Sequence, residues 1–321
     1  MVNPRPANLI EPDRWAYIVN PVAGNGRAFA IGKELALAAG AAGFGGPVQE
    51  TSGPGHATKL AASAVRQGAN IVAVVGGDGT VSEVAEALVG TDTCLMVLPG
   101  GGGNDLAGEL GIKPIGTGPV SLARALRVLA NAPRIRLDVI TLNGRACVQA
   151  GGTGLDAYVA RLRAVSKIRP AALAYGVGTI QGILTYRPTD VKVTVDGTVV
   201  WNARAYAVTI ANIGVYGGGL RIVPDADPMD GFIDVAIIGD IHRLEAIRIF
   251  PKVYRGTHVG HPQFHLHRGR HVTVTTNDQP QPVHIDGTLT GMSPIIATME
   301  GWTVLVAAPY ARWVKKEDTM H

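Results

Sequence analysis

An apolar run that ends in a glycine-rich turn constrains the fold of this chain more than any other stretch. Residues 71–75 are apolar and mostly β-branched, which predicts a strand buried on both faces. The sequence Gly-Gly-Asp-Gly-Thr follows at residues 76–80 and leads into a helix-forming segment. Glycines at such a junction leave backbone N–H groups uncovered at a helix start, where the helix dipole also favours an anion. The stretch suggests a phosphate site, although a need for positive φ explains a single turn of this kind at least as well.

Local spacing predicts where the helix after this turn begins. Thr80 and Glu83 stand three residues apart, as in a capping box, in which a hydroxyl and a carboxylate each satisfy a free backbone N–H group. We therefore expect Thr80 to be the N-cap of the helix.

Strand, loop and helix patterns alternate along the chain up to about residue 132. Strands are predicted over 15–20, 48–51, 71–75 and 94–98, and helices over 56–67, 121–130 and a segment ending at residue 39. This alternation is typical of a doubly wound parallel α/β sheet, in which ligands bind beyond the carboxyl ends of the strands. Glycine-rich loops follow Asn20, Val75 and Leu98. Because the three loops would gather at one edge, together they indicate a phosphate-bearing ligand.

The pattern changes after about residue 133, where strands dominate. Hairpins are predicted over 136–150 and 191–212, further strands over 232–238, 271–276, 283–286 and 302–307, and helices over 156–167, 171–184 and 242–254. We therefore assign residues 15–132 to a nucleotide-binding α/β domain. Residues 133–310 are assigned to a β-rich sandwich domain with helices at one side.

Composition and charge exclude several classes of protein. The formal net charge of +4 and the isoelectric point near 9.1 are too weakly basic to argue for nucleic acid. Residues 1–14 lack the apolar core of a signal peptide, and no apolar stretch reaches the ~18 residues of a membrane span. We expect a cytoplasmic protein, soluble or peripherally bound to a membrane. Cys94 and Cys147 lie in apolar runs and are predicted to be buried free thiols.

Two common nucleotide-binding signatures are missing from the sequence. The P-loop pattern G-x-x-x-x-G-K-[ST] does not occur, and the first strand–helix turn lacks G-x-G-x-x-G. Residues 152–157 fit G-x-G-x-x-A, but they lie far from the first strand and helix. We therefore expect a turn at this position.

A series of short motifs resembles the diacylglycerol kinase catalytic family of lipid kinases, which includes bacterial diacylglycerol kinases and sphingosine kinases. The motifs occur in the order of the family: Asn20-Pro21 with Gly24, Gly55-His56-Ala57, residues 76–80 with Glu83, residues 99–105, Pro224-Asp225 with Asp230-Gly231, and residues 284–287. The element at residues 76–80 alone is shared with NAD kinases. The two-domain form of the family, an α/β domain and a β-rich domain on the lipid side, matches the division made above.

The resemblance implies an ATP-dependent lipid kinase that uses Mg²⁺. It would transfer the γ-phosphate to the hydroxyl of a diacylglycerol-like or sphingoid lipid at the membrane surface. Phosphoryl transfer needs the phosphates held, their charge neutralised and the hydroxyl oriented. The residues implied to bind ATP are Asn20, Gly76, Gly77, Asp78, Gly79, Thr80, Gly102, Gly103 and Asn104. The oligomeric state is left open, with a homodimer among the options.

Four aspartates have implied roles in the chemistry. Asp286 corresponds to the general base of the family, and Asp138 to an acidic residue near the catalytic magnesium network. Asp225 and Asp230 correspond to the segment in which bacterial members hold a structural magnesium. Simpler explanations stay open for each aspartate: a hairpin turn at Asp286, pairing of Asp138 with a nearby arginine, and a solvated acidic loop at the other two.

The chain departs from the family pattern at two positions. Thr288 stands where the family usually has a glutamate that organises metal and water, and Gly102 stands where it has a threonine. These changes motivate the alternative of a nucleotide-binding regulatory protein with weak or no kinase activity. A NAD kinase is a third alternative, suggested by residues 76–80 alone.

Five histidines gather near the end of the chain: His258, His261, His265, His267 and His271. A zinc site would need converging ligands, and no carboxylate or cysteine stands at ligand spacing among them. We expect a solvated basic strand and loop, which would face anionic lipid headgroups.

Overall fold

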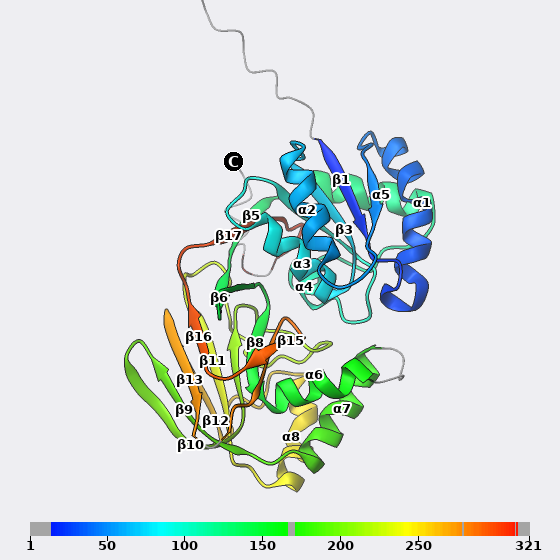
Figure 1. The fold of residues 1–321 in the computed structure, drawn as a ribbon. Coiled ribbons are helices and arrows are strands. Elements are labelled where there is room, and N and C mark those ends of the chain that lie inside the picture. The colour runs from blue at the N-terminus through cyan, green and yellow to red at the C-terminus, as the bar shows by residue number, and fades with distance from the viewer. Residues whose placement is uncertain (1–13, 166–170, 278, 312, 314–321) are drawn as a thin grey trace, which may run out of the picture.

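The molecule is built on two sheets that lie one above the other (Figure 1). The computed structural model describes residues 14–165, 171–277, 279–311 and 313. An α/β region forms the upper part in this view, and an antiparallel sheet with three helices forms the lower part (Figure 1).

The first sheet has the strand order β2-β1-β3-β4-β17-β5. Strands β1 (Trp15–Val19), β2 (Val48–Glu50), β3 (Ile71–Gly76) and β4 (Cys94–Pro99) run parallel. Every residue of β1, β3 and β4 is buried, because helices cover the sheet on both faces. The helices are α1 (Arg27–Ala42), α2 (His56–Arg66), α3 (Asp78–Leu88), α4 (Asp105–Glu109) and α5 (Pro119–Ala130), with the 3₁₀ turn η1 (Ala23–Gly26). The predicted doubly wound parallel sheet is confirmed.

Two strands from later in the sequence complete this sheet. Strand β17 (Thr303–Ala307) runs parallel to β4, and β5 (Arg134–Asp138) pairs antiparallel with β17. The sheets therefore do not follow the predicted limits of 15–132 and 133–310, since both strands lie within the second range. A short apolar strand has the same alternation in either sheet, so local pattern does not reveal its partner.

The second sheet has 11 antiparallel strands in the order β15-β14-β8-β10-β9-β13-β16-β6-β7, with β11 and β12 branching from β10. Its bounds are β6 (Ile140–Leu142), β7 (Arg145–Cys147), β8 (Ala150–Gly154), β9 (Thr189–Val195), β10 (Thr198–Ala211), β11 (Ile233–Gly239), β12 (Phe264–Gly269), β13 (His271–Thr276), β14 (Pro282–Ile285), β15 (Thr288–Met292) and β16 (Ile295–Thr298). Helices α6 (Leu155–Val165), α7 (Ala171–Thr185) and α8 (Arg243–Val253) lie together at one side (Figure 1). The predicted β-rich sandwich with helices at one side is confirmed.

Residues 152–157 do not form the predicted turn. They end β8 and begin α6, and β8 lies between β10 and β14 in the sheet. A Cβ atom on Gly152 would lie 2.3 Å from the carbonyl oxygen of Val208, so glycine is required by close approach of the neighbouring strand. Strands β15 and β16 were also not predicted as separate strands, because each has no more than five residues.

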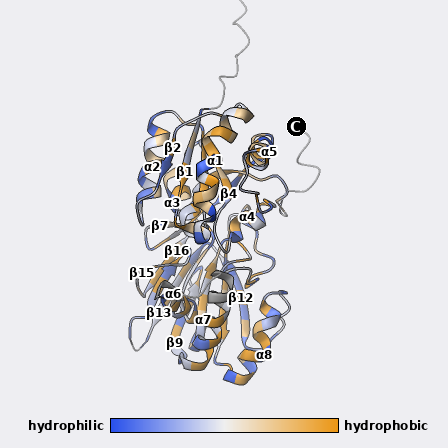
Figure 2. Cartoon of the chain, turned by 90° about the vertical axis from the view of Figure 1, so that its right-hand side faces the viewer, coloured by the Kyte–Doolittle hydropathy of each residue, from blue (hydrophilic) through white to orange (hydrophobic). Residues whose placement is uncertain are grey.

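The two cysteines and the lengths of the helices can be compared with what the sequence predicts. Cys94 and Cys147 are buried and free, as predicted. Within the described ranges, no helix combines the length and the apolar character that crossing a bilayer requires. Helix α7 is mostly hydrophobic, whereas α8 alternates hydrophobic and hydrophilic residues (Figure 2).

Candidate active site

Three loops meet at the carboxyl edge of the first sheet, as the sequence predicts. A Cβ atom on Gly24, in the loop after β1, would lie 1.9 Å from the carbonyl oxygen of Gly100, in the loop after β4. A Cβ atom on Gly101 would lie 2.3 Å from the Cα atom of Gly77, at the end of β3. The loops therefore pack backbone against backbone, at distances that a side chain would prevent.

Thr80 does not cap α3 as predicted. The helix begins at Asp78 with Gly77 as its N-cap, and the hydroxyl of Thr80 instead accepts a hydrogen bond from Asn20 Nδ2 (2.8 Å). The carboxylate of Glu83 accepts hydrogen bonds from backbone N–H groups at the start of α2. The capping-box prediction is wrong because free N–H groups of another helix, distant in sequence, bind this carboxylate.

Asp78 fixes the glycine loop after β4 from inside. Its Oδ2 accepts a hydrogen bond from the backbone N–H of Asn104 (2.7 Å), and its Oδ1 accepts one from Leu106 (3.4 Å). The side chain of Asn104 in turn closes the loop on the N–H and C=O of Gly101, each at 2.9 Å. Burial raises the pKa of Asp78, and these backbone N–H groups oppose the rise. Asp78 thus orders the loop over residues 100–104.

The edge formed by these loops suits an anion. Helix α3 has 11 residues and follows β3, which lies between β1 and β4 in the sheet. The positive end of its dipole therefore lies beside the glycine loops that follow β1 and β4. Gly79 is exposed, and a Cβ atom there would meet nothing within 4 Å, so its backbone is open to a ligand. Gly102 is also exposed, and Gly103 is partly exposed. The predicted ATP-binding residues therefore lie on three neighbouring loops, and their contact with a nucleotide stays a prediction.

Asp286 lies in the turn between β14 and β15, with φ at +47°. Its Oδ1 accepts hydrogen bonds from the backbone N–H groups of Gln149 (2.9 Å) and Ala150 (3.0 Å), and its Oδ2 accepts one from Val148 (3.0 Å). The thiol of Cys147 donates to Oδ1 at 3.5 Å, and burial raises the pKa of this thiol well above its ordinary value. Asp286 therefore makes a hairpin turn and also binds the loop between β7 and β8.

A glutamine connects Asp286 to the helix that begins at the glycine turn. The backbone N–H of Gln149 donates to Asp286, and its side chain donates to the hydroxyl of Ser82 (3.2 Å), one turn into α3. Gln149 is 3% exposed, so this connection is buried. The carboxylate of the second sheet and the helix start of the first sheet thus lie on the same side of the molecule.

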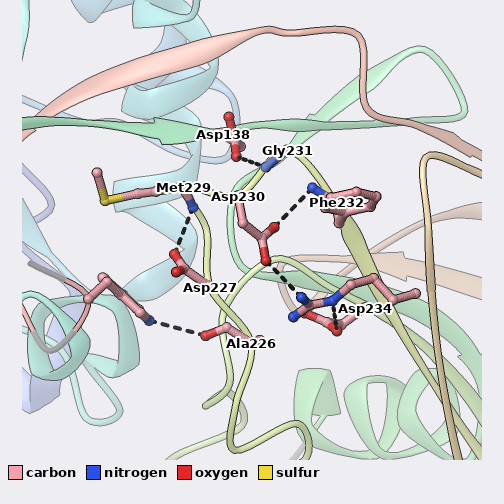
Figure 3. Close-up of polar contacts among 10 residues, drawn as sticks. Asp138, Ala226, Asp227, Met229, Asp230, Gly231, Phe232 and Asp234 are labelled. Atoms are coloured by element: carbon pink, nitrogen blue, oxygen red, sulfur yellow. Dashed lines mark hydrogen bonds and ion pairs between the residues drawn. The ribbon is translucent and has the colours of Figure 1, made fainter.

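Asp138 lies at the end of β5 beside the loop over residues 226–232 (Figure 3). Its Oδ2 accepts a hydrogen bond from the backbone N–H of Gly231 (2.8 Å), so it is not paired with Arg136, which binds Asp92. Burial raises the pKa of Asp138, the Gly231 hydrogen bond opposes the rise, and the negative charge of Asp230 adds to it. Asn212 Nδ2 connects the backbone carbonyls of residues 138 and 148, which links Asp138 to the loop that binds Asp286.

The two predicted metal ligands, Asp225 and Asp230, differ in their surroundings. Asp225 is exposed, whereas Asp230 accepts the backbone N–H of Phe232 (3.0 Å) and pairs with Arg268 (3.0 Å) (Figure 3). The guanidinium of Arg268 thereby neutralises the carboxylate of Asp230, as a bound cation would. Within the part of the chain that the structure describes, no three His, Cys, Asp or Glu side chains are spaced to hold a metal ion. The arrangement does not fit a magnesium ion at this pair, and no chemical step is derived through one.

The histidine prediction is wrong for one of its members. His258 is buried, its Nε2 lies 3.2 Å from the carbonyl oxygen of Ile222, and its ring packs edge-on against Phe264. Burial lowers the pKa of His258. His261 pairs with Glu245 at 3.1 Å. The many charged and polar residues over 258–271 predict a solvated segment, but the turn at His258 packs against β12 and buries this imidazole.

An apolar cavity of about 130 Å³ lies between the second sheet and its helices. Its apolar walls include Leu155, Ile183, Tyr206, Ile238 and Phe250. The sequence did not predict this cavity, because its walls come from many separate segments, among them α6, α7, α8, β10, β11 and β12. Apolar residues on each of these elements are equally well explained by an ordinary core.

A polar group lies at one end of this cavity. Asp156 and Tyr216 both line it, and the hydroxyl of Tyr216 donates to Asp156 Oδ2 at 2.6 Å. The hydroxyl of Thr209 donates to the same oxygen. The ring of His284 lies 6.4 Å from that of Tyr216, and among the described residues neither of its nitrogens has a hydrogen-bond partner. Burial lowers the pKa of His284, and the negative charges of Asp156, which lines the cavity, and of Asp286 both oppose this shift, so His284 lies near the polar group of the cavity and near the candidate base.

Two models of known protein families together match most of the chain. The diacylglycerol kinase catalytic domain matches residues 14–142, and the YegS C-terminal NAD kinase beta sandwich-like domain matches residues 149–308. A protein named diacylglycerol kinase from Mycobacterium tuberculosis is 28% identical over 229 residues, which span 66% of this chain and 69% of that relative.

Two solved structures share the fold. A diacylglycerol kinase from Bacillus anthracis has a TM-score of 0.68 at 20% identity, with 92% of this chain and 97% of that chain covered. An NAD kinase from Archaeoglobus fulgidus in complex with ATP has a TM-score of 0.55 at 14% identity, with 93% of this chain and 95% of that chain covered. At these identities the structures establish the fold alone. The two domain matches and the named relative show that this chain belongs to the diacylglycerol kinase catalytic-domain family, whose relatives are named as diacylglycerol kinases or lipid kinases.

Proposed function

We propose that this chain is an ATP-dependent lipid kinase that transfers the γ-phosphate of ATP to the hydroxyl of a diacylglycerol-like or sphingoid lipid. The observation that carries the proposal is the buried connection from Asp286 through Gln149 to α3. It brings a carboxylate of the second sheet to the helix that begins at the glycine turn. Phosphoryl transfer needs these two parts side by side: donors that hold the phosphates and a base that accepts the proton of the attacking alcohol.

The hydrogen bonds of Asp286 leave room for one more donor. A carboxylate offers about four acceptor sites, two on each oxygen. Two backbone N–H groups and the more distant thiol of Cys147 donate to Oδ1, and one backbone N–H donates to Oδ2. The remaining site on Oδ2 would accept the hydroxyl of the substrate and then its proton. Three backbone donors hold the carboxylate in place, so little reorganisation is needed when the alcohol binds.

The apolar cavity would hold part of the acyl chain of the acceptor. Its walls are apolar, and its lining residue Asp156 and the candidate base Asp286 both lie near His284, so an acyl chain in the cavity would place its alcohol on the side of Asp286. Such an acceptor resides in a membrane, and we propose that the protein is cytoplasmic and associates peripherally with the bilayer. Helix α8 is exposed beside the cavity and carries Arg248 and Lys252, which would favour anionic headgroups.

ATP would be bound at the edge formed by Asn20, the turn over residues 76–80 and the loop over residues 100–104. Mg²⁺ bound with ATP would neutralise charge on the phosphates. The chain supplies backbone N–H groups and the Thr80 hydroxyl at this edge, and Asp78 is already bonded to the loop. We propose ATP as the cosubstrate, in keeping with the related fold of an NAD kinase that was solved with ATP.

The decisive experiment is incubation of the chain with radiolabelled ATP, Mg²⁺ and a total lipid extract, followed by identification of the labelled lipid. Transfer of label to a lipid alcohol would support the proposal. ATP binding measured by calorimetry, without label on any lipid, would favour the regulatory protein that Thr288 and Gly102 suggest. Phosphorylation of NAD under conditions that leave lipids untouched would instead indicate a NAD kinase.

A further inference from the structure

Asp105 connects the two halves of the candidate active site. It is the first residue of α4, directly after the glycine loop, and its side chain is buried with 8% exposed. Its Oδ2 accepts the backbone N–H of Gly218 at 2.7 Å, and its Oδ1 accepts that of Gly219 at 2.8 Å. A carboxylate that accepts one N–H on each oxygen holds a turn at a fixed distance and orientation. The turn that Asp105 binds belongs to the second half of the chain.

The turn over residues 216–220 has a geometry that suits this contact. Tyr216 and Leu220 exchange two backbone hydrogen bonds at 3.0 and 3.1 Å, which closes the turn. The three glycines between them have φ values of +72°, +85° and +98°, which other residues rarely adopt. Two successive N–H groups of the turn thereby point to the same carboxylate.

The turn also forms part of the cavity wall. Tyr216, Gly217 and Leu220 line the cavity, and the hydroxyl of Tyr216 donates to Asp156 at its polar end. A shift of the turn would therefore move the wall and the polar group that the acceptor would contact.

On its other side, Asp105 continues the glycine loop that Asp78 holds. Asn104 donates to Asp78 through its backbone N–H, and Asp105 is the next residue. A Cβ atom on Gly103 would lie 2.7 Å from Asp78 Oδ2 and 3.8 Å from the Cα atom of Gly218, so the loop and the turn are in close contact. Asp78 at the start of α3 is thus connected to the cavity wall through its hydrogen bond to Asn104, the adjacent residue Asp105, and the hydrogen bonds of Asp105 to the turn.

We propose that Asp105 is a positioning residue that couples the nucleotide loop to the acceptor cavity, so that occupation of either one orders the other. This inference rests on the proposed function, because it concerns the same two ligands. Coupling of this kind is reciprocal: if the nucleotide tightens acceptor binding by a given factor, the acceptor tightens nucleotide binding by the same factor. A purely structural role for Asp105 would instead lower both affinities together, along with the melting temperature.

The test compares Asp105→Asn with Asp196→Asn in the full chain. The amide keeps one acceptor oxygen but turns its NH₂ group toward the second N–H, so one of the two hydrogen bonds is lost. Asp196 is a matched control, because it also accepts two backbone N–H groups, from Arg270 and His271, at a hairpin far along the second sheet. The probes are the non-hydrolysable ATP analogue AMP-PNP and soluble dioctanoylglycerol.

Hydrogen exchange gives the first readout and needs the nucleotide alone. AMP-PNP should slow exchange of the amides at residues 216–220 in the wild type and in Asp196→Asn, but not in Asp105→Asn. Calorimetry gives the second: AMP-PNP should tighten dioctanoylglycerol binding about 5- to 150-fold in the wild type, the usual range for coupled sites, and by a factor near one in Asp105→Asn. The affinity of Asp105→Asn for AMP-PNP alone should stay within about twofold of the wild type, since the phosphate edge is intact.

The results separate this inference from the proposed function. Bound AMP-PNP with no change at residues 216–220 in the wild type overturns the coupling, whether or not phosphate is transferred. Full coupling in Asp105→Asn, or a parallel loss of both affinities, also overturns it. If AMP-PNP slows exchange at residues 216–220 but no lipid is labelled in the assay with radiolabelled ATP, the proposed function is wrong and the coupling still holds.

Discussion

The carboxylates on the two sides of the candidate active site all accept backbone N–H groups, but they differ in the role that we propose for them. On the nucleotide side, Asp78 and Asp105 accept backbone N–H groups of neighbouring loops, so their charge is directed into the protein. On the proposed acceptor side, Asp286 is partly exposed, and one backbone N–H donates to its Oδ2. On the first side, we propose that the exposed backbone of Gly79 and Gly102 binds an anion. On the second side, we propose that Oδ2 of Asp286 binds an alcohol.

The largest effect should come from Asp286, the carboxylate that we propose as the general base. Loss of a general base lowers turnover by about 10²–10⁴-fold. Asp286→Asn should therefore lower kcat in that range in the radiolabel assay, while ATP affinity measured by calorimetry survives. Asp196→Asn is the control, since Asp196-Gly197 is a hairpin turn with nearly the same backbone, φ +46° against +47°. Wild-type turnover in Asp286→Asn would show that the base is another group.

A substitution confined to the nucleotide side should affect the nucleotide first. In Gly101→Ala the new Cβ would lie 2.3 Å from the Cα atom of Gly77, so one of the two loops must move. Overpacking of this kind costs about 1–3 kcal/mol, and we expect ATP affinity to fall by roughly one to two orders of magnitude. Gly40→Ala in α1 meets nothing within 4 Å and should bind ATP as the wild type does. If Gly101→Ala kept full ATP affinity, the nucleotide would not lie on these loops.

A substitution confined to the cavity should affect the acceptor first. Ala246 lies on α8 and lines the cavity, so Ala246→Phe would fill space that the acyl chain needs. A misfit of about 1.4 kcal/mol corresponds to a tenfold change in affinity, and we expect the lipid KM to rise about tenfold. The KM for ATP should not change. A rise in both KM values, with a lowered melting temperature, would mean that the cavity is part of the core rather than a binding site.

The two sides also differ in how far the sequence could reveal them. Strand, glycine turn and helix follow one another directly at residues 71–88, so the phosphate edge was predicted from local pattern. Parallel topology then brought Asn20 and residues 99–104 to the same edge. Local reasoning failed where the partner is distant: Glu83 caps α2 rather than its own helix, and β17 joins the first sheet.

The acceptor side depends almost entirely on such distant contacts. Asp286 was named through the family resemblance, but its hydrogen bonds to residues 148–150 connect segments more than 130 residues apart. Asp105 and the triglycine turn lie more than 110 residues apart, and neither segment alone indicates that they meet. The cavity walls come from many separate segments, and the apolar residues of each segment have the pattern of an ordinary core. Pairings between residues far apart in sequence leave no local periodicity, so sequence pattern could not predict them.

The smallest effect should come from the surface that would contact the membrane. Arg248 is exposed on α8 beside the cavity, and a basic residue near an anionic bilayer contributes about 1 kcal/mol of binding. Arg248→Ala should therefore weaken binding to vesicles that contain phosphatidylserine about fivefold, measured by co-sedimentation, with no effect on neutral vesicles.

The control for this prediction is Arg124→Ala. Arg124 is an exposed residue of α5, which packs on the first sheet, and this variant should bind vesicles as the wild type does because that side would face away from the bilayer. Since such attraction is screened within about 10 Å at 0.1 M salt, the difference between the two variants should shrink as salt is raised. Equal losses in both variants would mean that net charge, and not the side that carries the cavity, governs attraction to the membrane.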